Sequence, residues 1–358
     1  MATIAEQIEQ IEETLRKTPH HKATNGFIGL MRAKIARLKD KELESSTRSG
    51  GGGGGGGFSV KKQGDATVVL VGPPSAGKST LINKLTNAES RVAPYAFTTV
   101  TVVPGMFKYK EAYIQILDIP GLIEGAKEGK GRGKEVLSVA RGADLLLVMT
   151  DVHRPERIGK MVAELEGAGI RINKTPPEVL VEKKVSGGLD IHSNLKLEID
   201  KETIKEVARE YGIKSGDISI KEKLTLDRLF DAFSTNRVYV PAIFAVNKVD
   251  EAKKLKREKD IVYFSAQNDV SMQDLIDAMW KALKFVTVYL VEPEQDPDFS
   301  NSMIMKEGDT LLDVAQKIGT EFASTKKTVK IWGKDARFPG QEVSFSMKVS
   351  EGMQIRFI

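Results

Sequence analysis

The first part of the chain contains two stretches in which apolar residues recur every three or four positions. They occupy residues 4–15 and 27–38, and a break at Thr18-Pro19 separates them. Because an α-helix has about 3.6 residues per turn, this spacing places the apolar side chains on one face of a helix. The pattern predicts a helical hairpin over residues 1–48.

From Ala66 to about Leu283 the pattern changes to short apolar runs that alternate with helix-like stretches. Such alternation is typical of an α/β domain with a mostly parallel sheet and helices on both faces. This domain is expected over residues 65–168 and 240–283. Its expected core strands are Thr67 to Val71, Tyr113 to Leu117, Asp144 to Met149, Ala242 to Val246 and Ile261 to Phe264.

Residues 169–239 separate two consecutive core strands and are too many for a simple crossover connection. They contain a strand-like run, Val179 to Val185, and a helix-like run, Thr203 to Tyr211. We therefore expect an inserted α+β subdomain. A strand-like run, a helix-like stretch and further short strand-like runs predict a second small α+β domain over residues 284–358.

An unbroken run of glycines extends from Gly50 to Gly57. Glycine loses more conformational entropy on ordering than any other residue, so this run cannot form an element packed by side chains. One interpretation is a flexible spacer. The other is a loop whose backbone passes too close to a second segment for any Cβ. Both assign residues 49–64 to a linker.

The charge of the chain limits which kinds of partner it can bind. The chain has 54 Lys and Arg against 49 Asp and Glu, a net charge of +5, far weaker than expected of a protein that coats nucleic acid. A local basic face in the N-terminal hairpin, opposed only by Asp40, predicts either a solvated surface or a contact with RNA or an acidic partner. Its basic residues are Arg16, Lys17, Lys22, Arg32, Lys34, Arg37, Lys39 and Lys41.

The chain contains no cysteine, which excludes disulfides and thiolate metal sites. No apolar run approaches the roughly 20 residues needed to span a bilayer. The first residues are also too polar for a secretory signal. We expect a cytoplasmic protein that does not engage a membrane.

The strongest chemical signal follows the first core strand, where the spacing G-x-x-x-x-G-K-[ST] opens a helix-like run. In this pattern the backbone N–H groups surround an anion, Lys78 reaches the terminal phosphates and the Ser79 hydroxyl ligates Mg²⁺. The sequence therefore predicts a site for a nucleoside triphosphate. Its residues are Gly72, Pro73, Pro74, Ser75, Ala76, Gly77, Lys78, Ser79 and Thr80.

Two further motifs indicate which nucleotide binds. Asp118 and Gly121 follow the second expected core strand, where the carboxylate can hold Mg²⁺ through water and the glycine N–H can meet a γ-phosphate. Asp250 of the segment Asn247-Lys248-Val249-Asp250 can accept two hydrogen bonds, from the N1–H and the exocyclic amine of guanine, and adenine lacks both donors in that arrangement. A carboxylate left unpaired by the wrong base is costly, so GTP is favoured over ATP.

Several stretches resemble the Obg-related GTPases. They are Phe97-Thr98-Thr99, the segment from Asp118 to Ala126, and Gly129-x-Gly131-x-Gly133. The match narrows to the DRG branch, the developmentally regulated GTP-binding proteins, and covers essentially the whole chain. The narrower resemblance rests on His21-Lys22-Ala23-Thr24, the glycine run before Phe58, the long insertion and Phe338-Pro339-Gly340-Gln341.

The resemblance implies a P-loop G domain, an insertion like ribosomal protein S5 domain 2, and a C-terminal TGS domain of β-grasp fold. It implies ribosome-associated work in translation and leaves the need for an accessory protein open. It also implies that Ser265 and Ala266 contact the guanine oxygen and that Thr99, with Thr98 as runner-up, ligates Mg²⁺. Lys78, Thr99 and Gly121 are the expected catalytic residues.

Two positions bear on the rate of hydrolysis. Ras-like enzymes place a water-orienting glutamine after the second-switch glycine, and this chain has Leu122 there, which predicts slow intrinsic hydrolysis. Some relatives use a potassium ion held partly by an asparagine where this chain has Ser75, so potassium activation stays open. The chain is then either a GTPase switch or a GTP-gated binding module whose hydrolysis is incidental.

Overall fold

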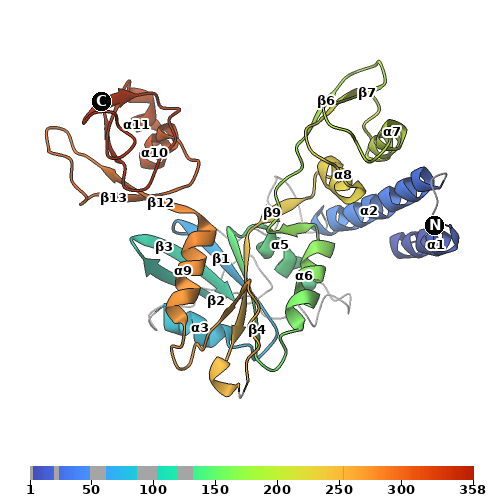
Figure 1. The fold of residues 1–358 in the computed structure, drawn as a ribbon, viewed down its shortest axis with the longest axis horizontal. Coiled ribbons are helices and arrows are strands. Elements are labelled where there is room, and N and C mark those ends of the chain that lie inside the picture. Colours follow the sequence, from blue (N-terminus) through green and yellow to red (C-terminus); the bar gives the residue numbers. More distant parts are fainter. Residues whose placement is uncertain (1–2, 20–23, 49–61, 87–102, 119–131, 253) are drawn as a thin grey trace. The chain divides into compact units, whose positions relative to one another are not determined.

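The computed structural model describes residues 3–19, 24–48, 62–86, 103–118, 132–252 and 254–358 (Figure 1). The chain divides into two compact units. One unit combines Met1–Gly57 with Ala163–Val240, and the other combines Phe58–Val162 with Pro241–Ile358. The predictions made for Thr98, Thr99, Gly121 and Leu122 concern positions outside the described residues.

The second unit contains the expected mostly parallel sheet. Neighbouring strands are parallel except at one edge, where β2 runs antiparallel to β3. Its order is β11 (Ile261–Tyr263), β10 (Ala242–Asn247), β4 (Leu145–Asp151), β1 (Ala66–Val71), β3 (Ala112–Asp118) and β2 (Val103–Tyr109). Strands β1 and β4 are fully buried, and β3 and β10 are buried at all but one position each, as expected of strands in a sheet covered on both faces.

Helices α3 (Lys78–Leu85) and α9 (Met272–Leu283) cover one face of this sheet. Leu81 and Met279 from these helices pack with Leu70 and Ile116 from the strands in one apolar cluster. Helices α5 (Arg132–Arg141) and α6 (Arg157–Gly167) lie on either side of β4 in the chain, and the 3-10 turn η1 (Val249–Glu251) follows β10.

Strand β2 was not among the expected core strands. It contains Pro104 and Gly105, both of which weaken a strand signal, and it is tolerated because it forms the edge of the sheet. Gly105 also has a packing role. A Cβ at this position would lie 2.5 Å from Thr86 Cγ2 and 3.0 Å from Ile82 Cγ2, both on or beside α3.

Residues 285–357 form a separate five-stranded sheet with two helices. Strands β12 and β16 are parallel neighbours, and the other pairs are antiparallel. The elements are β12 (Phe285–Leu290), β13 (Ser302–Lys306), α10 (Leu311–Ile318), α11 (Thr320–Thr325), β14 (Val329–Trp332), β15 (Gln341–Val343) and β16 (Gln354–Phe357), and the sheet order is β13-β12-β16-β14-β15. The helix-like stretch expected in this domain is divided at Gly319 into α10 and α11.

The first unit joins the N-terminal helices α1 (Ile4–Lys17) and α2 (Asn25–Arg48) to the insertion. Ala33 of α2 is fully buried with Ile204 and Phe230, so α2 completes the core of the insertion. The insertion contains β5 (Ile170–Ile172), β6 (Val179–Lys183), β7 (Leu189–Ser193), α7 (Lys201–Glu210), β8 (Gly216–Ile220), α8 (Leu226–Phe233) and β9 (Val238–Val240), with sheets β6-β8-β7 and β5-β9.

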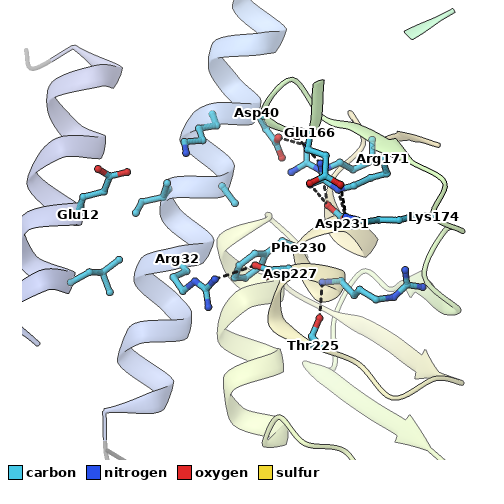
Figure 2. A pocket seen from close by; sticks show the side chains of 17 residues that line it. Glu12, Arg32, Asp40, Glu166, Arg171, Lys174, Thr225, Asp227, Phe230 and Asp231 are labelled. Atoms are coloured by element: carbon cyan, nitrogen blue, oxygen red, sulfur yellow. Dashed lines mark hydrogen bonds and ion pairs between the residues drawn. The ribbon is translucent and has the colours of Figure 1, made fainter. Parts of the chain in front are cut away.

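A chain of buried charges links α2 to the insertion beside a pocket of about 680 Å³ (Figure 2). Arg237 donates to Asp40 at 2.6 Å and to Asp231 at 2.7 Å. Arg171 makes a bidentate pair with Asp231 at 2.6 and 2.7 Å. Burial alone would raise the pKa of Asp231, but the hydrogen bonds from Arg171 and Arg237 outweigh it and hold that pKa below its ordinary value.

The basic face expected on the N-terminal helices is partly neutralised within this unit. Arg32 pairs with Asp227 at 3.4 Å, and Arg37 pairs with Glu210 at 3.8 Å. Asp40, the acid expected on that face, is buried and belongs to the ionic chain. Part of the positive charge therefore serves to dock α2 onto the insertion.

We predict that Arg237→Met destabilises this unit, because it leaves two buried carboxylates short of a cation. The free energy of local unfolding should fall by about 3 kcal/mol, measured by native-state hydrogen exchange of the α8 amides. The matched control is Lys174→Met, which breaks an exposed pair with Glu166 and should cost less than about 1 kcal/mol. Equal protection in both variants would contradict the prediction.

Candidate functional site

The carboxyl ends of β1, β3, β4 and β10 meet at one edge of the six-stranded sheet, because these strands are parallel neighbours. Ligands of open α/β sheets bind at this edge. The loop of residues 72–77 leaves β1 there, Asp118 ends β3, Asp151 ends β4 and Asn247 ends β10. The fold thus gathers motifs that lie far apart in the sequence.

Two glycines of the 72–77 loop are required by close packing. A Cβ on Gly72 would lie 2.4 Å from the carbonyl oxygen of Met149 in β4. A Cβ on Gly77 would lie 2.2 Å from the Asn247 amide nitrogen, and Gly77 has a φ of +89°. Ser75 also has a positive φ, 65°. This conformation is costly for a residue with a Cβ and is typical of tight functional loops.

Lys78 is the first residue of α3 and is buried. Its ammonium donates to the carbonyls of Gly72 at 3.0 Å and Pro73 at 3.1 Å. It lies 3.9 Å from Asp118, the last residue of β3. Burial lowers the pKa of Lys78, and the nearby Asp118 charge opposes that shift. The ammonium is therefore a cation largely removed from water beside the loop.

Asp118 faces Ser79 as well as Lys78. The Ser79 hydroxyl lies 3.4 Å from one carboxylate oxygen, and the other oxygen is buried without a hydrogen-bond partner among the described residues. Burial raises the pKa of Asp118, while Lys78 and Ser79 act in the opposite direction. A hydroxyl and an under-coordinated carboxylate are hard oxygen donors that suit Mg²⁺. Thr80, next along α3, is exposed.

Asn247 connects three segments of the site. Its amide nitrogen donates to the carbonyl of Ala76 at 2.9 Å. Its amide oxygen accepts the backbone N–H groups of Lys248 at 2.8 Å and Ala266 at 3.0 Å. Lys248 has a φ of 64° and begins the turn that carries Asp250. One side chain therefore joins the phosphate loop, the turn after β10 and the loop after β11.

Asp250 is exposed at this edge and has a partner that sequence reasoning missed. Asn268 donates its amide to one oxygen of Asp250 at 3.0 Å, and its own N–H donates to the Ser265 hydroxyl at 3.2 Å. The buried Ser265 thus orients Asn268, which orients Asp250. The signal in the sequence was weak, because Asn268 lies two residues beyond the segment Ser265-Ala266.

Sequence reasoning also missed Asp151 and Arg154. Asp151 is buried at the end of β4 and pairs with Arg154 at 2.5 Å. A signal was available, because an aspartate closes an apolar strand at the edge where Asp118 and Asn247 lie.

In the described part of the chain, no three His, Asp or Glu residues gather to hold a metal ion, and no helix there is long and apolar enough to cross a membrane.

Two adjacent protein families match most of the chain's central part. Residues 67–184 match the family described as "50S ribosome-binding GTPase", named MMR_HSR1. Residues 186–285 match the family described as "C-terminal region of MMR_HSR1 domain". The boundary between the two matches falls inside the insertion. The six-stranded sheet with its phosphate loop is accordingly a P-loop GTPase domain.

Full-length relatives give a narrower match. An uncharacterized GTP-binding protein of Methanocaldococcus jannaschii is 43% identical, over 98% of this chain and 91% of that protein. The developmentally-regulated GTP-binding protein 1 of Xenopus laevis is 39% identical over 94% of both chains. Ribosome-interacting GTPase 1 of Saccharomyces cerevisiae is 38% identical over 97% of this chain and 96% of that protein. The chain therefore belongs to the developmentally regulated GTP-binding proteins, the DRG family of GTPases.

Proposed function

We propose that this DRG-family GTPase works as a guanine-nucleotide switch that acts on the ribosome or on RNA in the cytoplasm. The observation that carries the nucleotide assignment is the set of side-chain hydrogen bonds that holds the phosphate loop, the turn of Asp250 and the loop of Ala266 and Asn268 together. Asn247 joins Ala76 to Lys248 and Ala266, and Asn268 aligns the Asp250 carboxylate. Phosphate and base recognition are thus held in one frame at the sheet edge.

Three kinds of group support phosphate binding in this proposal. The buried Lys78 ammonium supplies positive charge beside the loop. The residues from Ser75 to Ser79 supply backbone N–H groups at the N-terminus of α3, where the helix dipole favours an anion. Ser79 and Asp118, with Thr99, are the proposed Mg²⁺ residues, and the metal would neutralise phosphate charge.

Hydrolysis in such a site depends on positioning and charge stabilisation rather than on a covalent intermediate. We propose Lys78, Thr99 and Gly121 as the residues that act on the γ-phosphate. Leu122 has no group to orient water, which supports a slow intrinsic rate. Ser75, rather than asparagine, stands at the position linked to potassium in some relatives, and comparing rates in potassium and sodium salts decides whether this ion is used.

The flanking domains are the proposed working surfaces. We propose that residues 284–358 are a TGS domain of β-grasp fold, supported by the order β13-β12-β16-β14-β15 with parallel central strands β12 and β16. We propose that residues 169–239 resemble ribosomal protein S5 domain 2. The ribosomal assignment is supported by the names of the matched family and of the yeast relative. The alternative is a GTP-gated module whose hydrolysis is incidental.

We predict that Asp250→Asn moves nucleotide preference from GTP towards xanthosine triphosphate. An amide can donate to the xanthine oxygen, whereas it cannot accept both guanine donors. The affinity for GTP should fall at least about 100-fold, measured by competition against a fluorescent GDP. Asp269→Asn, which breaks only an exposed pair with Lys84, is the matched control. An unchanged preference in Asp250→Asn would disprove the guanine assignment.

We predict that the protein sediments with ribosomes in a GTP analogue and not in GDP. Single-turnover hydrolysis with and without ribosomes separates the two forms of the proposal. Strong stimulation by ribosomes supports the switch, because the partner then supplies what Leu122 cannot. Nucleotide-dependent sedimentation without stimulation supports the GTP-gated module. Equal sedimentation with ribosomes in the GTP analogue and in GDP would contradict both the switch and the GTP-gated module.

A further inference from the structure

The short loop after β4 lies between the two halves of the nucleotide site. Asp151, the last residue of β4, is 2% exposed and lies opposite Asn247 in the register of β4 and β10. The N–H of Val152 donates to the carbonyl of Asn247 at 3.1 Å. The loop is therefore attached to the strand end that carries the base-recognition turn.

Asp151 holds Arg154 in a defined place. One carboxylate oxygen accepts the N–H of His153 at 3.0 Å, and the other accepts Arg154 Nη2 at 2.5 Å. The Thr150 hydroxyl donates to the carbonyl of Arg154 at 3.0 Å, which fixes the backbone of the same residue. Burial alone would raise the pKa of Asp151, but the hydrogen bond and charge of Arg154 outweigh it, so this pKa lies below its ordinary value.

Arg154 in turn reaches the phosphate loop. Its Nη2 donates to the carbonyl of Pro74 at 3.4 Å. Lys78 holds the carbonyls of Gly72 and Pro73, so the first three carbonyls of the loop each accept a hydrogen bond from a cationic side chain. The carbonyl of Ala76 is held separately by Asn247, as described above.

Because two prolines follow Gly72, the orientation of the loop carbonyls affects how the loop can bind an anion. Pro73 and Pro74 have no N–H, so the carbonyls are the only polar backbone groups that this part of the loop offers. A carbonyl dipole turned towards a phosphate would repel it, whereas backbone N–H groups attract it. Anchoring the carbonyl of Pro74 on the side of Arg154 keeps this carbonyl turned away from the anion that the N–H groups from Gly77 onward attract. The N–H of Ala76 donates within the loop, to the carbonyl of Pro73 at 3.3 Å.

We propose that Arg154, held by the buried Asp151, is a positioning residue for the phosphate loop. It fixes the Pro74 carbonyl and so sets the orientation of the N–H groups that bind the nucleotide phosphates. This inference rests on the proposed nucleotide function. It assigns to Arg154 an effect on phosphate affinity and not on the choice of base.

The alternative is that Arg154 and Asp151 form an ordinary surface ion pair with no effect on nucleotide binding. The Arg154 side chain is 33% exposed, and exposed pairs contribute little to stability. The two accounts differ in what they predict for nucleotide binding. A surface pair leaves affinity unchanged, while a positioning residue changes affinity for the phosphates and leaves discrimination between bases intact.

We predict that Arg154→Ala weakens binding of both GDP and IDP by about tenfold. Asp250 acts on the base, so the ratio of the two affinities should stay at its wild-type value. Arg154→Lys keeps a cation within reach and should recover part of the loss. The affinities are measured by competition against a fluorescent GDP, with the melting temperature of each nucleotide-free variant recorded beside them.

Two further variants separate this effect from other causes. Lys160→Ala removes an exposed cation from α6 and should bind both nucleotides like the wild type. Asp151→Asn combined with Arg154→Leu removes both charges, so no buried carboxylate is left unpaired. This double variant should retain the tenfold loss, because the anchor on Pro74 is still missing.

Three results would overturn the inference. They are an unchanged GDP affinity in Arg154→Ala, a changed ratio of GDP to IDP affinity, or wild-type affinity in the double variant. The second result would place the effect on the base-recognition turn, and the third would assign it to the unpaired charge of Asp151. Failure of the wild-type protein to bind GDP at all would instead contradict the proposed nucleotide function.

Discussion

The side chain of Asn247 is the constraint on which the rest of the site depends. It donates to the phosphate loop at Ala76 and accepts N–H groups from Lys248 and Ala266, so three loops share one buried amide. A buried amide that lost one partner would pay the full cost of desolvation, which makes the arrangement cooperative. The Asn247 amide packs so closely against Gly77 that no Cβ would fit at this position.

Buried charges serve different purposes in the two units. In the unit that contains the insertion, the Asp231 carboxylate accepts hydrogen bonds from Arg171 and Arg237. The Asp40 carboxylate accepts from Arg237 and from the Ser234 hydroxyl. Each carboxylate oxygen of this network accepts at least one hydrogen bond, and the network specifies how α2 docks. Asp118 instead keeps one buried oxygen that has the Lys78 ammonium at 3.9 Å but no hydrogen-bond partner among the described residues. Buried unsatisfied groups are rare and commonly mark a functional position.

Much of the α/β domain could be predicted, because its signals are local. The core strands are predominantly apolar runs, and the chemical motifs follow those runs directly in the chain. Strand β2 was missed because Pro104 and Gly105 are both unfavourable in strands. The structure accommodates Pro104 at the edge of the sheet and requires Gly105 because Thr86 packs against it. Asn268 and Arg154 were missed because their roles depend on partners that the sequence does not place beside them.

The sequence by itself determined the kind of chemistry. The phosphate loop, the aspartate that ends β3 and the N-K-x-D turn are each defined by residue types at short, fixed spacings along the chain, so the order of residues suffices to recognise them. Only the tertiary structure decided which groups hold these motifs in place. The parallel sheet brings Asp151 beside Asn247, and folding of the insertion buries Asp40 against Arg237. Such contacts join residues far apart in the chain, and their energy comes from burial and partner geometry, which no local pattern encodes.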